Sequence, residues 1–208
     1  MDSTAFFKLA YGLYVVTTRK GDWDNGMICN TVVQVANKPE RLAVSINKSN
    51  WTHDVVKATG VMNVCALAES ASFDLFKRFG FQSGRNVEKF EGFPLARGAN
   101  GLALLTKDCT ATFELKVVSY TDLGTHGMFI CEVVDAKTVS DAPTMTYAYY
   151  HANVKPKPAA PAAASASEKK TRRWVCKICG YVYEGDELPA DFECPWCKHP
   201  ASDFEEVL

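Results

Sequence analysis

The sequence predicts a mainly β protein of the α+β class, made of one barrel-forming domain and a second, much smaller unit. Three observations predict this arrangement: several short strand patterns separated by turn residues, only a few short helical patterns, and an abrupt change of composition after Asn153. With 208 residues, of which 47% are hydrophobic, the chain can form one ordinary core and one small module.

The strand and helix patterns lie within residues 1–152. Alternation of apolar and polar residues indicates half-buried strands, and the clearest examples cover residues 42–46, 111–117 and 128–134. Short apolar patterns preceded by capping residues indicate helices, which are predicted to begin at Ser3, Thr52 and Ser70. Gly60 is placed to end the second of these helices. Short strands with few helices favour a β-barrel decorated by helices.

The last 35 residues hold two C-x-x-C pairs, formed by Cys176 with Cys179 and by Cys194 with Cys197. Four thiolates at this spacing close on one tetrahedral metal, and a soft tetrathiolate set suits iron or zinc. A unit this small depends on the bound metal for its folding. The alternative is a pair of disulfides, which a cytosolic chain disfavours because its thiols are kept reduced.

The surroundings of the four cysteines favour iron over a zinc ribbon that binds nucleic acid. Residues 174–208 carry two lysines against eight acidic residues, a net charge of −6, which repels a phosphate backbone. Six aromatic residues can form an apolar shell that limits solvent at the metal. They are Trp174, Tyr181, Tyr183, Phe192, Trp196 and Phe204.

The segment WVCKICGYVYEGDELPADFECPWCKHPASDFEEVL resembles a rubredoxin, in the short form found at the end of rubrerythrin-like proteins. The patterns C-x-x-C-G-Y-x-Y and C-P-x-C carry the resemblance, while Lys198 stands where many rubredoxins have a second glycine. The resemblance implies one iron that cycles between the ferric and ferrous states, held by Cys176, Cys179, Cys194 and Cys197. It therefore implies an electron carrier.

Between the two units, residues 153–173 are rich in proline, alanine and serine, with six positive charges and one negative charge. Nothing in this stretch is apolar enough to pack, so it is predicted to be a flexible linker. We therefore expect a first domain at 1–152, a linker at 153–173 and a metal-stabilised domain at 174–208.

Several functional classes are disfavoured by composition. A net charge of −1 gives no case for binding nucleic acid or an anionic membrane. No basic amino-terminal region precedes an apolar run, and no apolar stretch has membrane-spanning length, so a cytoplasmic protein is expected. The absence of G-x-G-x-x-G after a strand and of a Walker loop gives no support to Rossmann or P-loop sites. The isolated Cys29, Cys65, Cys109 and Cys131 are expected to be small buried hydrophobic residues.

The stretch from Ser45 to His53 (SINKSNWTH) is suited to hold an anion. It runs from the end of a predicted strand, through polar donors and one lysine, to the start of a predicted helix. The free N–H groups at a helix start favour a phosphate or carboxylate. The alternative is a solvated connection without a ligand, as many loops are.

The first domain resembles the flavin reductase family, the FMN-binding split barrel that includes flavoredoxin. Four segments carry the resemblance by their order and spacing: GMICNTVVQVANKPERLAVSINKSNWTHDVV, MNV, FGFQSGRNVEKFEG and GTHGMFICEVVDA. The resemblance implies that FMN is the cofactor. The residues implied to hold it are Asn30, Thr31, Val32, Ser45, Asn47, Lys48, Thr52, Ser83 and Lys89.

His126 is the candidate catalytic residue. It follows Gly124 and Thr125, where the family usually has Gly-Asp-His, so the acidic neighbour is missing here. The resemblance implies that this imidazole lies near the place where nicotinamide stacks. The alternative is a solvent-exposed histidine in a turn.

The combination of the two units resembles the high-molecular-weight rubredoxins of anaerobic bacteria. It implies hydride transfer from NADH or NADPH to FMN, followed by single-electron transfer to the iron and then to a flavodiiron protein that reduces nitric oxide or dioxygen. It also implies a homodimer. Two alternatives remain: a flavin reductase that supplies reduced flavin to a monooxygenase, and a flavin-free barrel whose zinc ribbon is a binding module.

Overall fold

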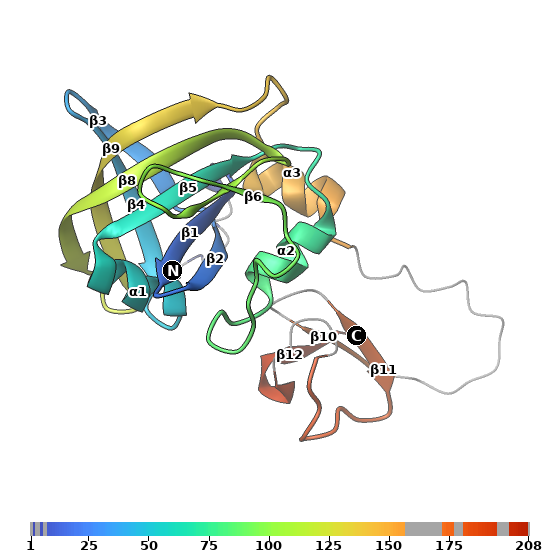
Figure 1. The fold of residues 1–208 in the computed structure, drawn as a ribbon. Helices are drawn as coiled ribbons and strands as arrows, with labels where there is room; N and C mark the ends of the chain where they lie inside the picture. The colour runs from blue at the N-terminus through green and yellow to red at the C-terminus, as the bar shows by residue number, and fades with distance from the viewer. Residues whose placement is uncertain are drawn as a thin grey trace. The chain divides into compact units, whose positions relative to one another are not determined.

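A computed structural model describes residues 2, 5, 8–156, 172–176, 181–194 and 200–207. The chain forms two compact units, Met1–Val154 and Lys155–Leu208, which are described separately (Figure 1). In the part of the chain described, no helix combines the length and the apolar character needed to cross a membrane.

A seven-stranded sheet builds the first unit, in the order β2-β1-β5-β8-β9-β4-β3. Each neighbouring pair of strands is antiparallel. The strands are β1 (Tyr14–Lys20), β2 (Trp23–Cys29), β3 (Val32–Asn37), β4 (Glu40–Asn47), β5 (Val61–Leu67), β8 (Cys109–Asp122) and β9 (His126–Thr138). This architecture confirms the mainly β fold, and it contains all three segments predicted to be strands.

The two edge strands of this sheet meet at the connection between β2 and β3. Thr31 lies in that connection and bonds to Ser45 of β4, which brings the end of β2 against β4. β4 also pairs with β9 on its other side, with Asn47 opposite His126. The curled sheet therefore places the ends of β2, β4 and the start of β9 in one region.

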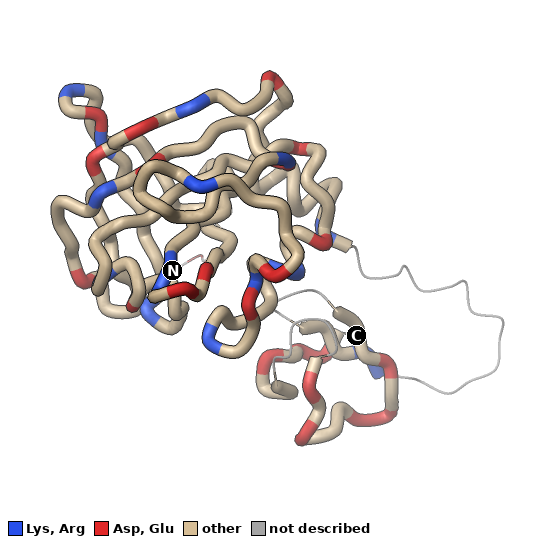
Figure 2. Tube along the Cα trace, in the orientation of Figure 1, with Lys and Arg blue, Asp and Glu red and all other residues tan. Residues whose placement is uncertain are grey.

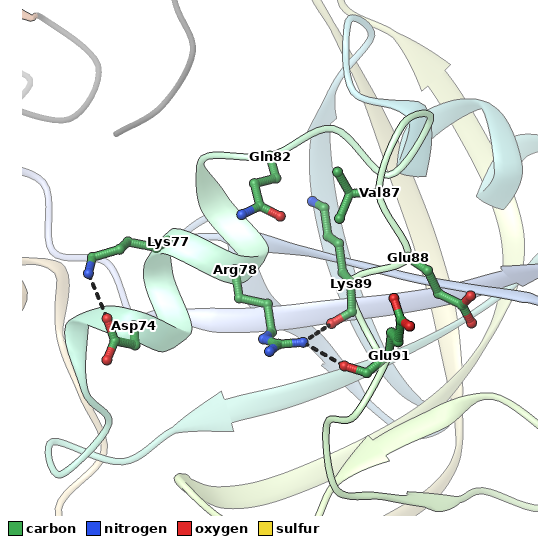
Figure 3. A pocket seen from close by; sticks show the side chains of 8 residues that line it. All are labelled: Asp74, Lys77, Arg78, Gln82, Val87, Glu88, Lys89 and Glu91. Carbon is green, nitrogen blue, oxygen red and sulfur yellow. Dashed lines mark hydrogen bonds and ion pairs between the residues drawn. The ribbon is translucent and has the colours of Figure 1, made fainter. Parts of the chain in front are cut away.

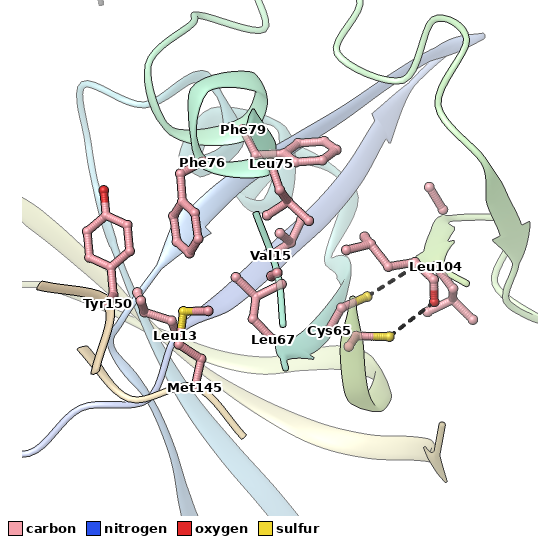
Figure 4. Close-up of a cluster of buried hydrophobic side chains, with 14 of the residues drawn as sticks. Leu13, Val15, Cys65, Leu67, Leu75, Phe76, Phe79, Leu104, Met145 and Tyr150 are labelled. Atoms are coloured by element: carbon pink, nitrogen blue, oxygen red, sulfur yellow. Dashed lines mark hydrogen bonds between the residues drawn. The ribbon is translucent and has the colours of Figure 1, made fainter. Parts of the chain in front are cut away.

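Alternating side chains of the sheet divide the core into two clusters. Val15 and Cys65 belong to one cluster, whereas their neighbours Val16 and Val64 belong to the other. Successive side chains of a strand point to opposite faces, so both faces of β1 and β5 are covered. Figure 4 shows part of the first cluster, in which Phe76 and Phe79 pack over β1 and β5.

Short helices cover the sheet. The second predicted helix is α1 (Trp51–Thr59), which ends at Gly60 with a φ of 72° as expected for a helix stop. The third is α2 (Phe73–Gly80), whose N-cap position is Ser72 and not the predicted Ser70, although the Ser72 side chain makes no capping hydrogen bond. Ala71 is buried, and its N–H donates to the carbonyl of Ala68 in a turn. The extended N-cap residue is therefore Ser72, which follows this turn. The helix predicted from Ser3 falls largely outside the described residues.

The remaining elements of the first unit are small. A two-stranded ribbon is formed by β6 (Leu95–Arg97) and β7 (Ala103–Leu105). The loop between them is held by the buried carboxylate of Glu114, which accepts from the N–H groups of Ala99 and Asn100. After β9, the chain forms α3 (Tyr147–Tyr149) and a π-helical turn, η2 (Tyr150–Val154).

The second unit contains a three-stranded sheet in the order β11-β10-β12. Its elements are β10 (Arg172–Cys176), β11 (Val182–Gly185), the 3₁₀ turn η3 (Ala201–Asp203) and β12 (Phe204–Val207). Arg172 pairs with Glu206 of β12, and Arg173 pairs with Glu184 of β11. Two cations that the sequence groups with the linker therefore belong to this sheet.

Candidate functional sites

The connection between β2 and β3 forms one wall of the candidate cofactor site. Thr31 Oγ1 donates to the carbonyl of Ser45 at 2.6 Å, and Ser45 N donates back to the carbonyl of Thr31 at 3.0 Å. Val32 begins β3 opposite Val44. Asn30, Thr31, Val32 and Ser45 are all half-buried. Four of the predicted FMN-binding residues therefore lie together.

The segment that joins β4 to α1 forms the base of the site. Asn47 Oδ1 accepts from both the N–H and the hydroxyl of Ser49, each at 2.9 Å. Asn50 is the extended N-cap of α1, and its side chain makes no capping hydrogen bond. The helix has nine residues, and the N–H of His53 already donates to the carbonyl of Asn50 at 3.0 Å. The N–H groups of Trp51 and Thr52 before it need acceptors from outside the helix. This arrangement fits an anion such as the phosphate of FMN.

Lys48 ties this segment to the hairpin between β8 and β9. Its Nζ lies 2.8 Å from Asp122 Oδ2, and its N–H donates to the carbonyl of Thr125 at 3.0 Å. The hydrogen bond with Asp122 raises the pKa of Lys48, and the same bond lowers the pKa of Asp122. Lys48 therefore reaches the site edge as a cation that already has a carboxylate partner.

Thr52 is held in place by a residue that the sequence analysis did not select. Asn25 of β2 donates through Nδ2 to Thr52 Oγ1 at 2.8 Å, and both side chains are buried. Because Thr52 Oγ1 accepts this bond, its own hydroxyl proton is available for an acceptor such as phosphate. A Cβ atom at Gly84 would collide with Asn25 Oδ1, so only glycine allows the 82–87 loop to close over this pair.

The loop that carries Ser83 lies against the start of α1. Arg85 donates to Asp54 Oδ2 at 2.7 Å, and the indole N–H of Trp23 donates to the carbonyl of Gly84 at 3.1 Å. Ser83 itself is exposed, and its hydroxyl accepts from the N–H of Arg85. The structure thus brings Ser83 to the same region as Thr52.

Lys89 is placed differently from the other predicted cofactor ligands. Its side chain is buried, and Nζ donates to the carbonyls of Gly26 at 2.9 Å and of Phe79 at 3.2 Å. Burial lowers the pKa of Lys89 to about 8. These contacts join β2 to the end of α2, so the role of Lys89 seen here is to stabilise the packing of these two elements.

A cavity of ≈ 390 Å³ opens beside α2 (Figure 3). It is lined by Asp74, Lys77, Arg78, Gln82, Val87, Glu88, Lys89 and Glu91. Lys77 is paired with Asp74, and Arg78 donates to the carbonyls of Lys89 and Glu91. Its cations are thus engaged by protein groups, and the predicted FMN-binding residues other than Lys89 lie outside its lining.

His126 is the first residue of β9 and is half-buried. It stands opposite Asn47 in the β4–β9 pair, and its Nδ1 lies 2.9 Å from the hydroxyl of Thr125. The residue before the histidine thus offers the ring a hydroxyl group. His126 and the base of the site are brought together by strand pairing.

The described part of the metal unit contains Cys176 and Cys194, while Cys179 and Cys197 lie outside the described residues. Both described cysteines are buried, with exposed fractions of 1% and 0%. The N–H of Cys176 donates to the carbonyl of Tyr181 at 2.9 Å, and Glu193 forms a β-bridge with Pro200. Backbone pairing therefore joins a described residue at the start of each C-x-x-C pair, or just before it, to one that stands after the pair in the sequence.

Aromatic rings surround these closures, as the sequence predicts. Phe192 contacts Tyr181, Tyr183 and Phe204, and Tyr183 contacts Trp174. The predicted Trp196 lies outside the described residues. Two buried cysteines beside an aromatic cluster fit a soft metal ion such as iron.

Comparison with known families matches both units. Residues 6–157 match the flavin reductase like domain, and residues 174–205 match the rubrerythrin, rubredoxin-like domain. The chain therefore belongs to the flavin reductase-like family of oxidoreductases and carries a rubredoxin-like domain after it.

Relatives share either the whole arrangement or the first unit. The high molecular weight rubredoxin of Moorella thermoacetica is 36% identical over 229 aligned residues, which cover 100% of both chains. A ferric-chelate reductase (NAD(P)H) of Archaeoglobus fulgidus is 42% identical over 151 residues, which cover 73% of this chain and 89% of the relative.

Solved structures show the same fold for the first unit. A putative flavin reductase from Haemophilus somnus matches with a TM-score of 0.63 at 22% identity, covering 71% of this chain and 95% of the other. Flavoredoxin from Methanosarcina acetivorans matches with a TM-score of 0.57 at 24% identity, covering 62% and 69%.

The buried Lys89 makes folding stability depend on pH in a defined direction. Its pKa falls from 10.5 to about 8 on folding, so between these values the unfolded chain binds more protons than the folded chain. The free energy of unfolding therefore rises with pH from about 8 to 10.5, by up to about 3 kcal/mol from this group. Lys89→Met should lack this rise, and denaturant unfolding of both proteins at several pH values measures it. Parallel pH profiles for the two proteins would contradict the assignment.

Proposed function

We propose that this chain takes hydride from NADH or NADPH onto FMN in the first unit and passes single electrons to one iron in the second unit. The observation that carries the proposal is that both units occur together, in the same order, over the full length of a relative named as a high molecular weight rubredoxin. When bound, FMN supplies the chemistry that accepts two electrons together and gives them up singly.

The residues of the first unit would bind and orient the cofactor. The uncapped start of α1 and the hydroxyl of Thr52 would hold the phosphate, with Lys48 as the nearby cation. Asn30, Thr31 and Val32, fixed against Ser45, would line the ring system. His126 would face the nicotinamide, because strand pairing places it beside Asn47 at the base of the site.

The second unit would hold the iron through Cys176, Cys179, Cys194 and Cys197. The buried positions of Cys176 and Cys194 and the aromatic shell support a site from which water is excluded. A reduced tetrathiolate is consistent with a cytoplasmic location. Because both centres lie on one polypeptide, the effective concentration of the acceptor is on the order of millimolar.

The electron path is tested by comparing iron-loaded and zinc-loaded protein. Zinc keeps a tetrahedral thiolate site but has no redox chemistry. On anaerobic titration with NADH and with NADPH, the flavin band should bleach in both proteins. The ferric thiolate band should also bleach in the iron protein, at a rate independent of protein concentration. A flavin that is reduced while the iron stays oxidised would contradict the proposed path.

A second candidate function is reduction of a diffusing acceptor by the first unit alone. It is favoured by the similarity to a ferric-chelate reductase and to an NADH-dependent FMN reductase, RutF of Stutzerimonas stutzeri, which is 30% identical over 71% of this chain. In this case the zinc-loaded protein would reduce a ferric chelate, or release reduced flavin to a monooxygenase, as fast as the iron-loaded protein does. A binding module without redox function would bind no flavin and hold zinc.

The onward acceptor is proposed to be a flavodiiron protein with a basic docking surface. A putative diflavin flavoprotein of Nostoc contains a related region that covers 72% of this chain and 26% of the relative. Figure 2 shows acidic residues spread along the trace of the second unit. Residues 172–208 have a net charge of −4 when Arg172 and Arg173 are included. Opposite charge on a partner would speed its association.

We therefore expect electron transfer to such a partner to slow as salt increases. Between 0.01 and 0.15 M salt the screening length falls from about 30 to about 8 Å, which should lower the second-order rate about tenfold. Neutralising two exposed positions with Asp186→Asn and Glu187→Gln should flatten the salt dependence, whereas Asp141→Asn in the first unit should not. Stopped-flow kinetics with the partner measure both, and a rate indifferent to salt refutes the steering.

The protein is also proposed to be a homodimer. Val33 and Val35 of the edge strand β3 and Val134 of β9 are 59%, 51% and 65% exposed. β3 and β9 both pair with β4. An exposed apolar edge strand is a ready surface for a second chain.

Val35→Lys should shift the protein towards the monomer, because it places a charge in the proposed interface. Val139→Lys is the matched control and should leave the assembly unchanged. Val139 is 41% exposed and lies outside both β3 and β9. Sedimentation velocity measures the two states. A wild-type monomer at micromolar concentration would overturn the dimer.

A further inference from the structure

His53 stands at the centre of a polar chain that joins three segments of the candidate site. It lies on α1 and is 3% exposed. Its Nδ1 lies 3.1 Å from Asp54 Oδ1, and its Nε2 lies 3.2 Å from the hydroxyl of Tyr120 on β8. The second oxygen of Asp54 accepts from Arg85 of the 82–87 loop at 2.7 Å. One buried imidazole thus connects the loop, the helix start and the β8–β9 hairpin.

The chemistry of the partners fixes the direction of these bonds. A carboxylate only accepts, so in the neutral ring Nδ1 carries the proton and donates to Asp54. Nε2 is then an acceptor, and the hydroxyl of Tyr120 donates to it. Both nitrogens of the buried ring are satisfied by partners that are themselves partly exposed, and loss of a partner for a buried nitrogen is costly.

Packing holds the His53 and Tyr120 rings against the hairpin that carries His126. The His53 ring lies 5.5 Å from Phe129 and 5.8 Å from Tyr120, measured between centroids. A Cβ at Gly127 would lie 2.6 Å from His53 Nε2 and 2.5 Å from Tyr120 Cε2. The two rings therefore cover the backbone of the residue that follows His126, and a side chain there would push them apart.

A second tie between the same segments is weaker. Lys48 also joins the start of α1 to this hairpin through Asp122, but the two side chains are 37% and 53% exposed. Exposed ion pairs contribute little to stability and are screened by salt. Pairing of β4 with β9 sets the register of the hairpin. The bond from the buried His53 imidazole to Tyr120 is the side-chain contact that can hold the hairpin against α1.

We propose that His53 and Tyr120 are positioning residues that hold the hairpin bearing His126 at a fixed spacing from the start of α1. Resting on the proposed function, this spacing sets the distance between the phosphate-binding and nicotinamide-facing parts of one site. His53 and Tyr120 act through the hairpin, and neither needs to touch the cofactor.

The test uses full-length variants that remove the bond from either side. Tyr120→Phe keeps the ring and loses the hydroxyl. His53→Asn keeps a donor near Nδ1 and loses the acceptor at Nε2, whereas His53→Gln restores an acceptor near Nε2. In the FMN-free protein, hydrogen exchange of residues 122–128 should rise about fivefold in Tyr120→Phe and in His53→Asn, as expected for one buried hydrogen bond. His53→Gln should recover most of the protection.

The same variants separate positioning from general stability. With FMN bound, the KM for NADH should rise about fivefold in Tyr120→Phe and His53→Asn, while the Kd for FMN changes less than about twofold. The double variant should add nothing to the single variants if one bond is responsible. Tyr147→Phe, the same chemical change on α3, is the matched control and should leave exchange and KM unchanged.

Two outcomes overturn the inference: unchanged exchange at 122–128 in Tyr120→Phe, or an increase spread evenly over the first unit. Failure of the wild-type protein to bind FMN would instead overturn the proposed function. The exchange measurement on FMN-free protein still decides whether the hairpin depends on His53 in that case.

Discussion

The pairing of β4 with a strand on each side is the constraint on which the candidate site depends. Val44 and Ile46 are fully buried in the core, so the intervening Ser45 and the following Asn47 point to the other face. A slip of one residue would bury these polar groups, and the register is therefore fixed by the core. That register places Thr31 beside Ser45 and His126 opposite Asn47.

The sequence predicts those parts of the site that depend on local pattern. The segment from Ser45 to His53 combines a strand end, polar donors and a helix start within nine residues, and the structure has all three. The C-x-x-C spacing likewise predicts a metal site without knowledge of the fold. The predicted cap of α2 was wrong because Ser70 and Ser72 have the same chemistry, and only the burial of Ala71 distinguishes them.

What could not be predicted depends on contacts between distant segments. Asn25 and Thr52 are 27 residues apart, and Arg85 and Asp54 are 31 apart. No periodicity links such pairs. The family resemblance implies that Lys89 contacts the cofactor, whereas in this structure its side chain is buried and bonds the carbonyl of Phe79, next to the packing of Phe90 on Phe79. The sequence places Arg172 and Arg173 in the linker because of their charge and neighbours. In the structure they belong to β10, which pairs with the strands that carry Glu206 and Glu184.

The ion pair between Lys48 and Asp122 is compatible with a phosphate at the start of α1. Asp122 also accepts from the N–H of Gly124 at 2.8 Å, so its carboxylate stays in the hairpin when the lysine turns away. An ammonium group has three donors on a flexible stem and can serve a second anion. Because this pair is exposed, its loss costs little, and the buried contacts of His53 remain to keep the hairpin in place. The exposed residue is thus free to bind, while the buried one holds the geometry.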